Sequence, residues 1–343
     1  MNRPLAILML LCLAGCTTVS RKDASQAGLW RFIVEDRYGY IDKTGRTAIP
    51  AKYANAGSFS EGLAFVELPD GRRGYIRANG TLAFSFENEN GDCCQYFHEG
   101  LAPVRRGGKN GFINPTGEVV IPPRFDAAYQ FSQGCAPVKL DDSWGIIDRN
   151  GKWIVEPSFQ LLSPYSEGLS VAVTHDKKWG YLDTKGETAI PFRFTFATDF
   201  HGGLALVADS EGRQFINKTG QVVHRIPSHL RVIRPFFDGS LAAAQDTKTK
   251  RWGYVNKSLE RILPYQYEDC SDFSEGLAAV LIDGKWGYIN TQGVLAIPPR
   301  FTECQDFKNG HARVSLSEDD NMWRGSGAII DRDGQIICHI PPG

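Results

Sequence analysis

An internal repeat with a period of about 35 residues sets the strongest limit on the fold of this chain. The repeated element is a short pattern of an aromatic residue, Gly, two further apolar residues and Asp or Asn, as in WGYIN at 286–290. Its glycine, or the residue that replaces it, stands at positions 39, 74, 111, 145, 180, 214, 253, 287 and 328. Repetition of this kind predicts a modular fold in which neighbouring units bury one another's apolar faces.

Three further signals recur with the same period. Asp or Asn followed three residues later by Gly, as in DRNG at 148–151, is typical of a hairpin turn. An Ile-Pro step followed by an aromatic residue, as in IPPRF at 297–301, ends each unit, and an aromatic-x-x-Gly pattern precedes each new apolar strand. Each unit is therefore predicted to contain three main strands.

These motifs resemble the WG-repeat (KWG) family of bacterial β-repeat proteins, and the resemblance covers essentially everything from Gly28 onward. The match is specific because many copies of the WG element stay in phase with the three other signals. Three units depart from the pattern. The second has the insertion FSFENENGDCCQY, the sixth has Gln214 in place of Gly, and the seventh has Leu259 in place of the turn Gly.

We expect an all-β repeat array of about nine antiparallel modules, each with three strands or, if the linker contributes one, four. The first strand of a unit, for example residues 277–282, is apolar at every position, so each small sheet must be covered on both faces. We expect the array to be open and curved or superhelical, because nine blades exceed the usual four to eight and neither terminus supplies a strand that completes the other. A closed, propeller-like ring is the alternative.

The first 15 residues have the features of a lipoprotein signal peptide: Arg3, an apolar run from Leu5 to Ala14, and a small-residue cleavage site. The tetrad ending at Cys16 resembles the bacterial lipobox, which implies cleavage before Cys16 and attachment of acyl chains such as palmitate to it. Residues 16–27 are then expected to form a flexible tether, and residues 28–343 the WG-repeat β domain. Several acyl chains give a stable membrane anchor. By resemblance to Gram-negative lipoproteins, Thr17 after the cysteine favours the outer membrane, on a side that the sequence leaves open.

Charge and cysteine content narrow the classes of partner. The formal net charge is -1, and no basic field of the kind that binds nucleic acid is present.

Cys270 and Cys304 occupy equivalent places in adjacent modules, so we predict a disulfide between them, with two buried thiols as the alternative. The cysteine and histidine spacings match no zinc site, and no metal or other cofactor is expected.

No constellation typical of catalysis stands out, so we expect a protein that is not an enzyme. The repeated tryptophans are the weak candidates for ligand binding, because an exposed aromatic row would suit stacking on sugar rings, although a periodic aromatic is more often core. These residues are Trp144, Trp179, Trp252 and Trp286. The first hypothesis is a lipid-anchored cell-envelope scaffold that binds envelope proteins, and the alternative is a module that binds glycan or peptidoglycan of the cell wall.

Overall fold

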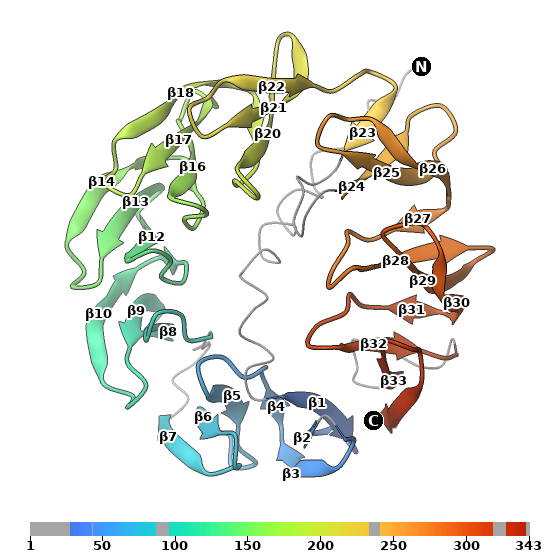
Figure 1. Cartoon of the computed structure of the whole chain (residues 1–343). Helices are drawn as coiled ribbons and strands as arrows, with labels where there is room; N and C mark the ends of the chain where they lie inside the picture. Colours follow the sequence, from blue (N-terminus) through green and yellow to red (C-terminus); the bar gives the residue numbers. More distant parts are fainter. Residues whose placement is uncertain (1–27, 43, 87–95, 233–240, 318–326, 341–343) are drawn as a thin grey trace, which may run out of the picture.

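The computed structural model describes residues 28–42, 44–86, 96–232, 241–317 and 327–340. The signal peptide, the tether and Cys16 predicted above lie outside these residues. The described residues form nine small antiparallel sheets, here called blades, which follow one another around a ring (Figure 1). The prediction of an all-β repeat array is thereby confirmed.

The first five blades are built as follows. Blade 1 contains β1 (Leu29–Val34), β2 (Arg37–Asp42) and β3 (Thr47–Tyr53). Blade 2 contains β4 (Asn55–Ala56), β5 (Leu63–Glu67), β6 (Arg73–Arg77) and β7 (Leu82–Phe86). Blade 3 contains β8 (Ala102–Arg106), β9 (Lys109–Ile113) and β10 (Val119–Phe125), and blade 4 contains β11 (Ala127–Ala128), β12 (Cys135–Leu140), β13 (Ser143–Asp148) and β14 (Trp153–Phe159). Blade 5 contains β15 (Leu161–Leu162), β16 (Leu169–Val173), β17 (Trp179–Asp183) and β18 (Thr188–Phe194).

The last four blades each have four strands. Blade 6 contains β19 (Phe196–Ala197), β20 (Leu204–Asp209), β21 (Gly212–Asn217) and β22 (Val222–Arg225). Blade 7 contains β23 (Leu230–Val232), β24 (Leu241–Asp246), β25 (Trp252–Asn256) and β26 (Arg261–Tyr267). Blade 8 contains β27 (Asp269–Cys270), β28 (Leu277–Ile282), β29 (Lys285–Asn290) and β30 (Leu295–Phe301), and blade 9 contains β31 (Glu303–Cys304), β32 (His311–Ser315), β33 (Gly327–Asp331) and β34 (Ile336–Ile340).

Within a blade, consecutive strands pair antiparallel. In blade 8 the order is β27-β28-β29-β30, with Val280 opposite Gly287 and Tyr288 opposite Ile297. The short first strand lies toward the centre of the ring and the Ile-Pro strand at its outer edge (Figure 1). The linker between modules therefore supplies a short additional strand of two or three residues. This matches the four-stranded module, which was one of the two module types expected from the sequence.

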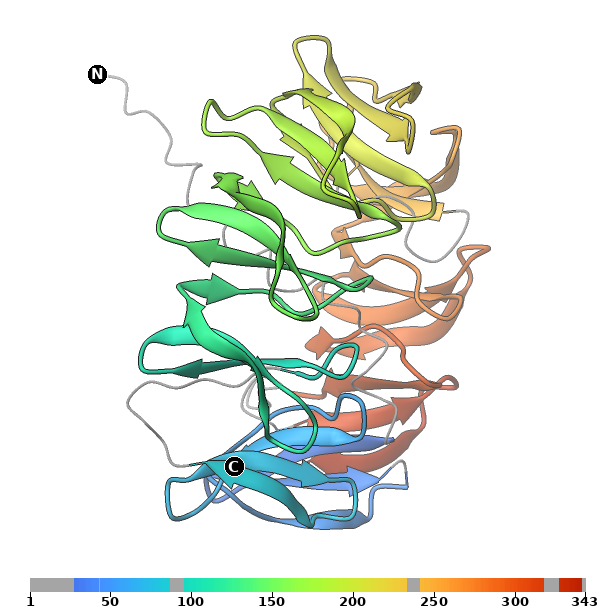
Figure 2. The same cartoon turned by 90° about the vertical axis from the view of Figure 1, so that its left-hand side faces the viewer.

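The strands run between two faces of the ring, as the edge-on view shows (Figure 2). We call one the DxxG face, because it carries the Asx-x-x-Gly turns such as Asn290–Gly293, together with the turns that precede each second strand. The opposite side is the hairpin face, where tight turns such as Asp283-Gly284 join the second and third strands. In the Asx-x-x-Gly turns, the first side chain accepts backbone amides two and four residues on, for example Asp148 from Asn150 and Lys152.

The array is closed, which is the alternative that the sequence left open and not the open array that we expected first. Blade 9 packs directly on blade 1 through a cluster containing Phe32, Ile41, Ile329 and Ile340. Each terminal blade pairs only its own described strands, so closure depends on side-chain packing and no strand is exchanged. A search of the sequence for a strand at one terminus that completes the blade at the other terminus cannot detect this kind of closure.

Candidate functional site

The side chain after the repeated glycine lies at the centre of each interface between blades. It is at most 1 % exposed at every such position, whether Tyr, Phe or Ile. In four blades its tyrosine hydroxyl donates a hydrogen bond of 2.6–2.7 Å to a backbone carbonyl of the next blade: Tyr40 to Gly57, Tyr181 to Thr198, Tyr254 to Ser271 and Tyr288 to Gln305. Burial raises the pKa of Tyr288, so its hydroxyl remains a donor.

In several blades, serine and glutamate side chains before the second strand join neighbouring blades on the DxxG face. The Ser274 hydroxyl donates to the Phe307 carbonyl at 2.7 Å, and the Glu275 carboxylate accepts the Gly310 amide at 2.9 Å. Arg332 of the next blade lies 3.6 Å from the same carboxylate. Ser60 with Glu61 in blade 2 and Ser166 with Glu167 in blade 5 make the same two contacts with the backbone, and Glu99 of blade 3, which follows His98, makes the glutamate contact. We call this set of contacts the Ser-Glu latch.

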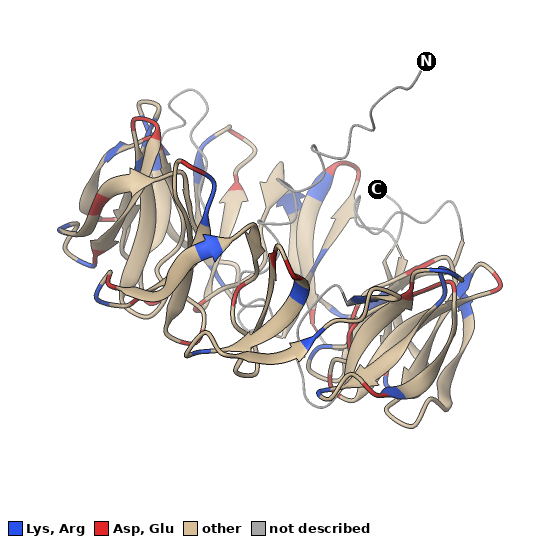
Figure 3. Ribbon diagram, turned by 90° about the horizontal axis from the view of Figure 1, so that it is seen from above, with Lys and Arg blue, Asp and Glu red and all other residues tan. Residues whose placement is uncertain are grey.

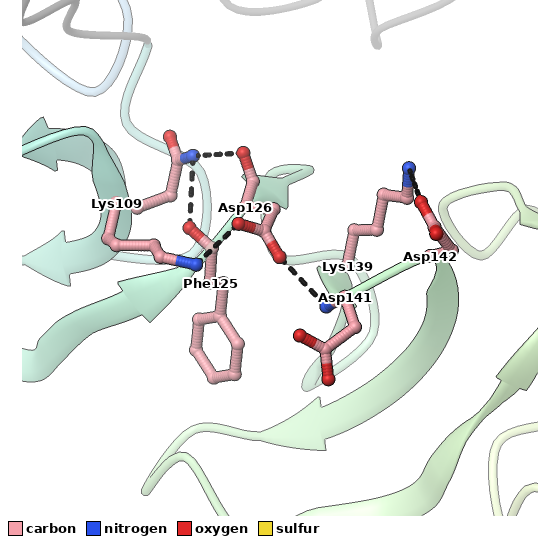
Figure 4. Close-up of polar contacts among 7 residues, drawn as sticks. Lys109, Phe125, Asp126, Lys139, Asp141 and Asp142 are labelled. Carbon is pink, nitrogen blue, oxygen red and sulfur yellow. Dashed lines mark hydrogen bonds and ion pairs between the residues drawn. The ribbon is translucent and has the colours of Figure 1, made fainter.

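A second polar contact joins neighbouring blades on the hairpin face, as Figure 4 shows between blades 3 and 4. Asp126 follows β10, pairs with Lys109 and accepts the Asp141 amide at 2.8 Å. The Lys109 ammonium holds the pKa of Asp126 below its usual value. Glu268 makes the equivalent contacts with Arg251 at 3.4 Å and with the Gly284 amide at 3.2 Å. These carboxylates therefore have structural partners.

The turn glycines of the DxxG face lie against the Ile-Pro strand of the preceding blade. A Cβ added to Gly334 would stand 2.8 Å from Cγ2 of Ile297. At the closing interface, a Cβ on Gly45 would stand 2.3 Å from Cβ of Cys338, which occupies the position of Ile297. Both glycines have a φ near +80°, so the turn requires glycine for conformation as well as for space.

The structure places the four repeated tryptophans at the hairpin-face end of each third strand, packed against the clusters between blades. Trp252 is buried, with 8 % of its surface exposed, and Trp144, Trp179 and Trp286 are partly buried. The Trp144 ring stacks on Tyr129, with a centroid distance of 4.9 Å. This placement favours a packing role and leaves three of the rings with an exposed edge.

The structure corrects the disulfide predicted between Cys270 and Cys304, because both are free cysteines. Cys270 packs in the cluster between blades 7 and 8, and Cys304 in the cluster between blades 8 and 9, so each thiol has a separate environment. Burial raises the pKa of both thiols to about 12. The structure therefore shows two free, partly buried thiols, which is close to the alternative of two buried thiols.

One group of residue types associated with hydrolysis lies between blades 5 and 6. The Ser163 hydroxyl donates to Asp199 at 2.7 Å, and burial raises the pKa of Asp199 while it lowers that of nearby His201. The same Ser163 oxygen accepts the Val171 amide at 3.0 Å. Thr198 and Ser271 accept the equivalent amides in other blades, so Ser163 has a structural role.

Neither a metal centre nor a membrane-spanning helix is found in the described part of the chain. No group of three or more His, Cys, Asp or Glu side chains within it is arranged to hold a metal ion. No helix within it is long and apolar enough to cross a membrane.

The turns of the hairpin face differ from blade to blade, while the turns that join the last two strands on the DxxG face keep Asx and Gly in every blade except blade 2, which has Arg77, and blade 7, which has Leu259. The hairpin turns of the first eight blades are solvent-exposed and comprise Glu35-Asp36, Asp70-Gly71, Gly107-Gly108, Asp141-Asp142, His175-Asp176, Ser210-Glu211, Lys248-Thr249 and Asp283-Gly284. Figure 3 shows acidic and basic residues interspersed over both the turns and the strands. The molecule thus has one uniform face and one varied face.

Sequence reasoning did not identify the tyrosine hydroxyls or the Ser-Glu latch as contacts between blades. The signal was present, because Tyr288 and Ser274 recur in phase with the glycine. Their partners are backbone groups 17 to 37 residues away, which carry no sequence mark.

Comparison with known proteins identifies the repeat. Six stretches match the family model described as the WG containing repeat, namely residues 38–71, 111–143, 144–179, 179–208, 252–286 and 286–318. They cover more than half of the chain. No curated protein matches the sequence.

Solved structures with a similar course of the chain share little sequence with it. BamB from Moraxella catarrhalis is 13 % identical, over 91 % of this chain and 96 % of its own, with a TM-score of 0.38. A eukaryotic initiation factor is 13 % identical, over 90 % and 84 %, with a TM-score of 0.43. Apo AztD from Citrobacter koseri is 11 % identical, over 84 % and 93 %, with a TM-score of 0.38. At TM-scores below 0.5 these likenesses say nothing about the function of this chain.

Proposed function

Because the chain belongs to the WG-repeat family and forms a ring of nine blades in its described residues, we propose that it is a non-catalytic scaffold that binds other proteins in the cell envelope. A lipid anchor at Cys16 holds it to a membrane in this proposal, by preference the outer membrane.

The difference between the two faces carries the proposal. Residues that repeat from blade to blade, such as Tyr288, Ser274 and Glu275, are engaged in contacts between blades. The turns of the hairpin face occupy one structural position in each blade but present different side chains, from Gly107-Gly108 to His175-Asp176. A rigid frame that displays varied loops is the arrangement by which repeat proteins form extended binding surfaces.

Crosslinking in intact cells tests the binding face. A photo-reactive amino acid at Asp283 or His175 on the hairpin face should yield crosslinked proteins, since both positions are exposed. Gln292 and Asn150, in exposed turns of the DxxG face, are the matched controls and should yield few. Protein crosslinks of equal yield from both faces, or from neither, would contradict the proposal.

The anchor has a separate test. The mature N-terminal peptide should begin at Cys16 and carry acyl chains in its mass spectrum. Replacement of Cys16 by Ala should release the protein from membranes. A mature protein that begins elsewhere would remove the anchor from the proposal.

Glycan binding is retained as a second candidate because Trp144, Trp179 and Trp286 keep an exposed edge on the hairpin face. It predicts sedimentation of the protein with isolated cell wall. That sedimentation should weaken when Trp144 is replaced by Leu, which keeps an apolar contact with the blade interface but removes the ring. Unchanged sedimentation would contradict glycan binding through this residue.

A further inference from the structure

Large hydrophobic side chains that remain exposed recur at the start of the outer strands of the ring. Nine of those in the described residues lie within three residues after the turn that joins the last two strands of a blade, and are 40 to 60 % exposed. We call them the aliphatic rim: Leu82, Val119, Val120, Val222, Val223, Ile262, Val294, Leu295 and Ile336. Single exposed aliphatic residues need no explanation, but recurrence at the start of the outer strand in six blades marks a contact surface.

The rim lies at the outer edge of the DxxG face. In blade 8, Leu295 pairs with Ile289, the residue before the Asn290–Gly293 turn. Six of the nine side chains belong to the four consecutive blades 6 to 9. In blades 1 and 5 the same positions hold the smaller pairs Thr47-Ala48 and Thr188-Ala189. Blades 6 to 9, one arc of the ring, are thus the longest run of consecutive blades that carry the rim.

The chain also enters the ring on this face and beside this arc. Leu29, the first residue of β1, pairs with Asp42 at the start of an Asx-x-x-Gly turn. Blade 1 packs against blade 9, which ends the arc. Between Cys16 and Gly28 lie 11 residues (28 - 16 - 1), a length that spans at most about 40 Å. An anchor at Cys16 therefore keeps the arc within a few tens of ångströms of the lipid surface.

Charge on this face favours apolar over electrostatic attachment. Two of its basic side chains are already engaged, with Lys218 lying 3.1 Å from Glu167 and Arg332 lying 3.6 Å from Glu275. Acidic and basic residues are interspersed over the described residues, which disfavours electrostatic attraction of this face to anionic lipid (Figure 3). Contact with lipid through the rim should be insensitive to salt.

We infer that the aliphatic rim of blades 6 to 9 is a lipid-contacting surface that lays the DxxG face on the membrane in which Cys16 is anchored. This inference rests on the proposed lipid anchor. It orients the molecule, because the varied hairpin face then points away from the membrane toward soluble partners. The occupant of the rim is the acyl-chain boundary of a bilayer, and the contact is hydrophobic.

Photolabelling by lipid tests the surface with the full chain. The protein, purified from membranes with its native N-terminus, is reconstituted into phosphatidylcholine vesicles that contain a diazirine-bearing phosphatidylcholine. After illumination, labelled peptides should contain Val222–Val223, Ile262 and Val294–Leu295, with a yield unchanged by high salt. Labelling confined to the N-terminal peptide, or equal on the Asp283-Gly284 turn, would overturn the inference.

A matched pair of variants sharpens the test. Replacing Val294 and Leu295 by Gln should lower labelling of the arc by about tenfold, because two apolar contacts with lipid are lost. Replacing Val119 and Val120 by Gln changes the start of the outer strand of blade 3, where Val119 is equivalent to Leu295, and should leave labelling of the arc nearly unchanged because blade 3 lies outside it. Equal effects of the two pairs would overturn the preference for blades 6 to 9.

The same samples separate this inference from the anchor proposal. An N-terminal peptide without acyl chains overturns both. An acylated Cys16 with an unlabelled rim overturns the lipid contact alone. A photo-reactive residue at Val294 that crosslinks to a protein in cells, in place of lipid, assigns the rim to a protein partner and also overturns the contact with lipid.

Discussion

The interface between blades 8 and 9 and the interface between blades 9 and 1 share one geometry but differ in their side chains. Both place a turn glycine of one blade against the Ile-Pro strand of the other, Gly334 on Ile297 and Gly45 on Cys338. The interior interface adds the Tyr288 hydroxyl and the Ser-Glu latch of Ser274. At the closing interface, Ile329 replaces the tyrosine and provides no hydroxyl.

The apolar cluster of the closing interface is also smaller than that of the interior interface. The cluster between blades 8 and 9 contains ten buried side chains in the described residues, among them Tyr288 and Phe301. The closing cluster contains four, supplemented by partly buried neighbours such as Trp30. His311 and Arg313 of β32 occupy positions that hold Leu277 and Ala279 in blade 8, and burial lowers the pKa of Arg313 to about 10. The closing interface is therefore expected to open before the others.

The largest expected effect comes from removing the central side chain of the interior interface. Tyr288 to Ala should lower the free energy of unfolding by about 3–5 kcal/mol, because a fully buried aromatic ring and its hydrogen bond are lost. Urea denaturation measures the change. A loss below about 1 kcal/mol would show that this interface does not limit stability.

Gly45 to Ala should act selectively on the closing interface. The added methyl would meet Cβ of Cys338 at 2.3 Å and would force a non-glycine residue to a φ of 79°, at a combined cost of about 2–4 kcal/mol. Gly62 to Ala is the matched control, because its φ is 80° and no atom lies within 4 Å, so it should cost only about 1–2 kcal/mol. Hydrogen exchange should accelerate in β1 and β34 for the first variant alone, and equal costs would argue against packing at this contact.

Thiol labelling compares the two interfaces without changing either. Cys338 lies in the closing interface and Cys304 in the interior one, where burial raises its pKa to about 12. Cys338 should react with a maleimide at least about tenfold faster in the native protein, if the closing interface opens about 1.4 kcal/mol more readily. Peptide mapping assigns the label, and faster reaction of Cys304 would reverse the ranking of the two interfaces.

Removing one hydroxyl should have a smaller effect. Tyr288 to Phe should cost about 1–2 kcal/mol, because the Gln305 carbonyl loses a donor at 2.7 Å while the ring remains. Tyr96 to Phe, at a ring that is 42 % exposed, is the control and should fall within about 0.5 kcal/mol of the wild type. A Tyr288 to Phe variant as stable as the control would mean that water replaces the hydroxyl.

The smallest effect is expected from acid, at the interior interface between blades 5 and 6. Partial burial raises the pKa of Glu167, but Lys218 and the Gly203 amide prevail and hold this pKa below its ordinary value of 4.5. A carboxyl with a lowered folded-state pKa contributes stability above about pH 4.5, and this contribution is lost as the pH falls through the folded-state value. Glu167 to Gln should therefore be less stable than the wild type at pH 7 and closer to it at pH 3, by urea denaturation at each pH, and a constant difference would contradict this role.

The repeat in the sequence predicted the modules, their turns and their order, because those depend on local residues such as the Asp148 turn. The closed ring was predicted only as the alternative to an open array, since closure depends on Ile329 and Cys338, which replace the tyrosine and the isoleucine found at these positions in blade 8. The disulfide prediction was wrong because equivalent positions in adjacent blades, Cys270 and Cys304, contact different neighbours. Equivalence in a repeat predicts similar surroundings, and it does not predict contact.

The candidate tryptophans show a similar limit of prediction from the sequence. The sequence marks Trp286 and Tyr288 equally, yet Tyr288 is fully buried and Trp286 only partly, since Trp286 lies at the end of its strand near the hairpin face. The aliphatic rim also escaped sequence reasoning, because Val294 and Leu295 resemble ordinary strand residues until the position of the outer strand is known.

The contacts between neighbouring blades join residues close in the chain, such as Ser274 and Phe307, whereas closure joins Gly45 to Cys338. As the chain is synthesised, each blade can dock on the one before it without waiting for distant sequence, which favours rapid ordered growth. The ring cannot close until the last strand has emerged. A truncated chain cannot complete this step and would leave the apolar faces of both terminal blades uncovered. Closure therefore separates finished chains, which bury these faces, from incomplete or damaged chains, which expose them.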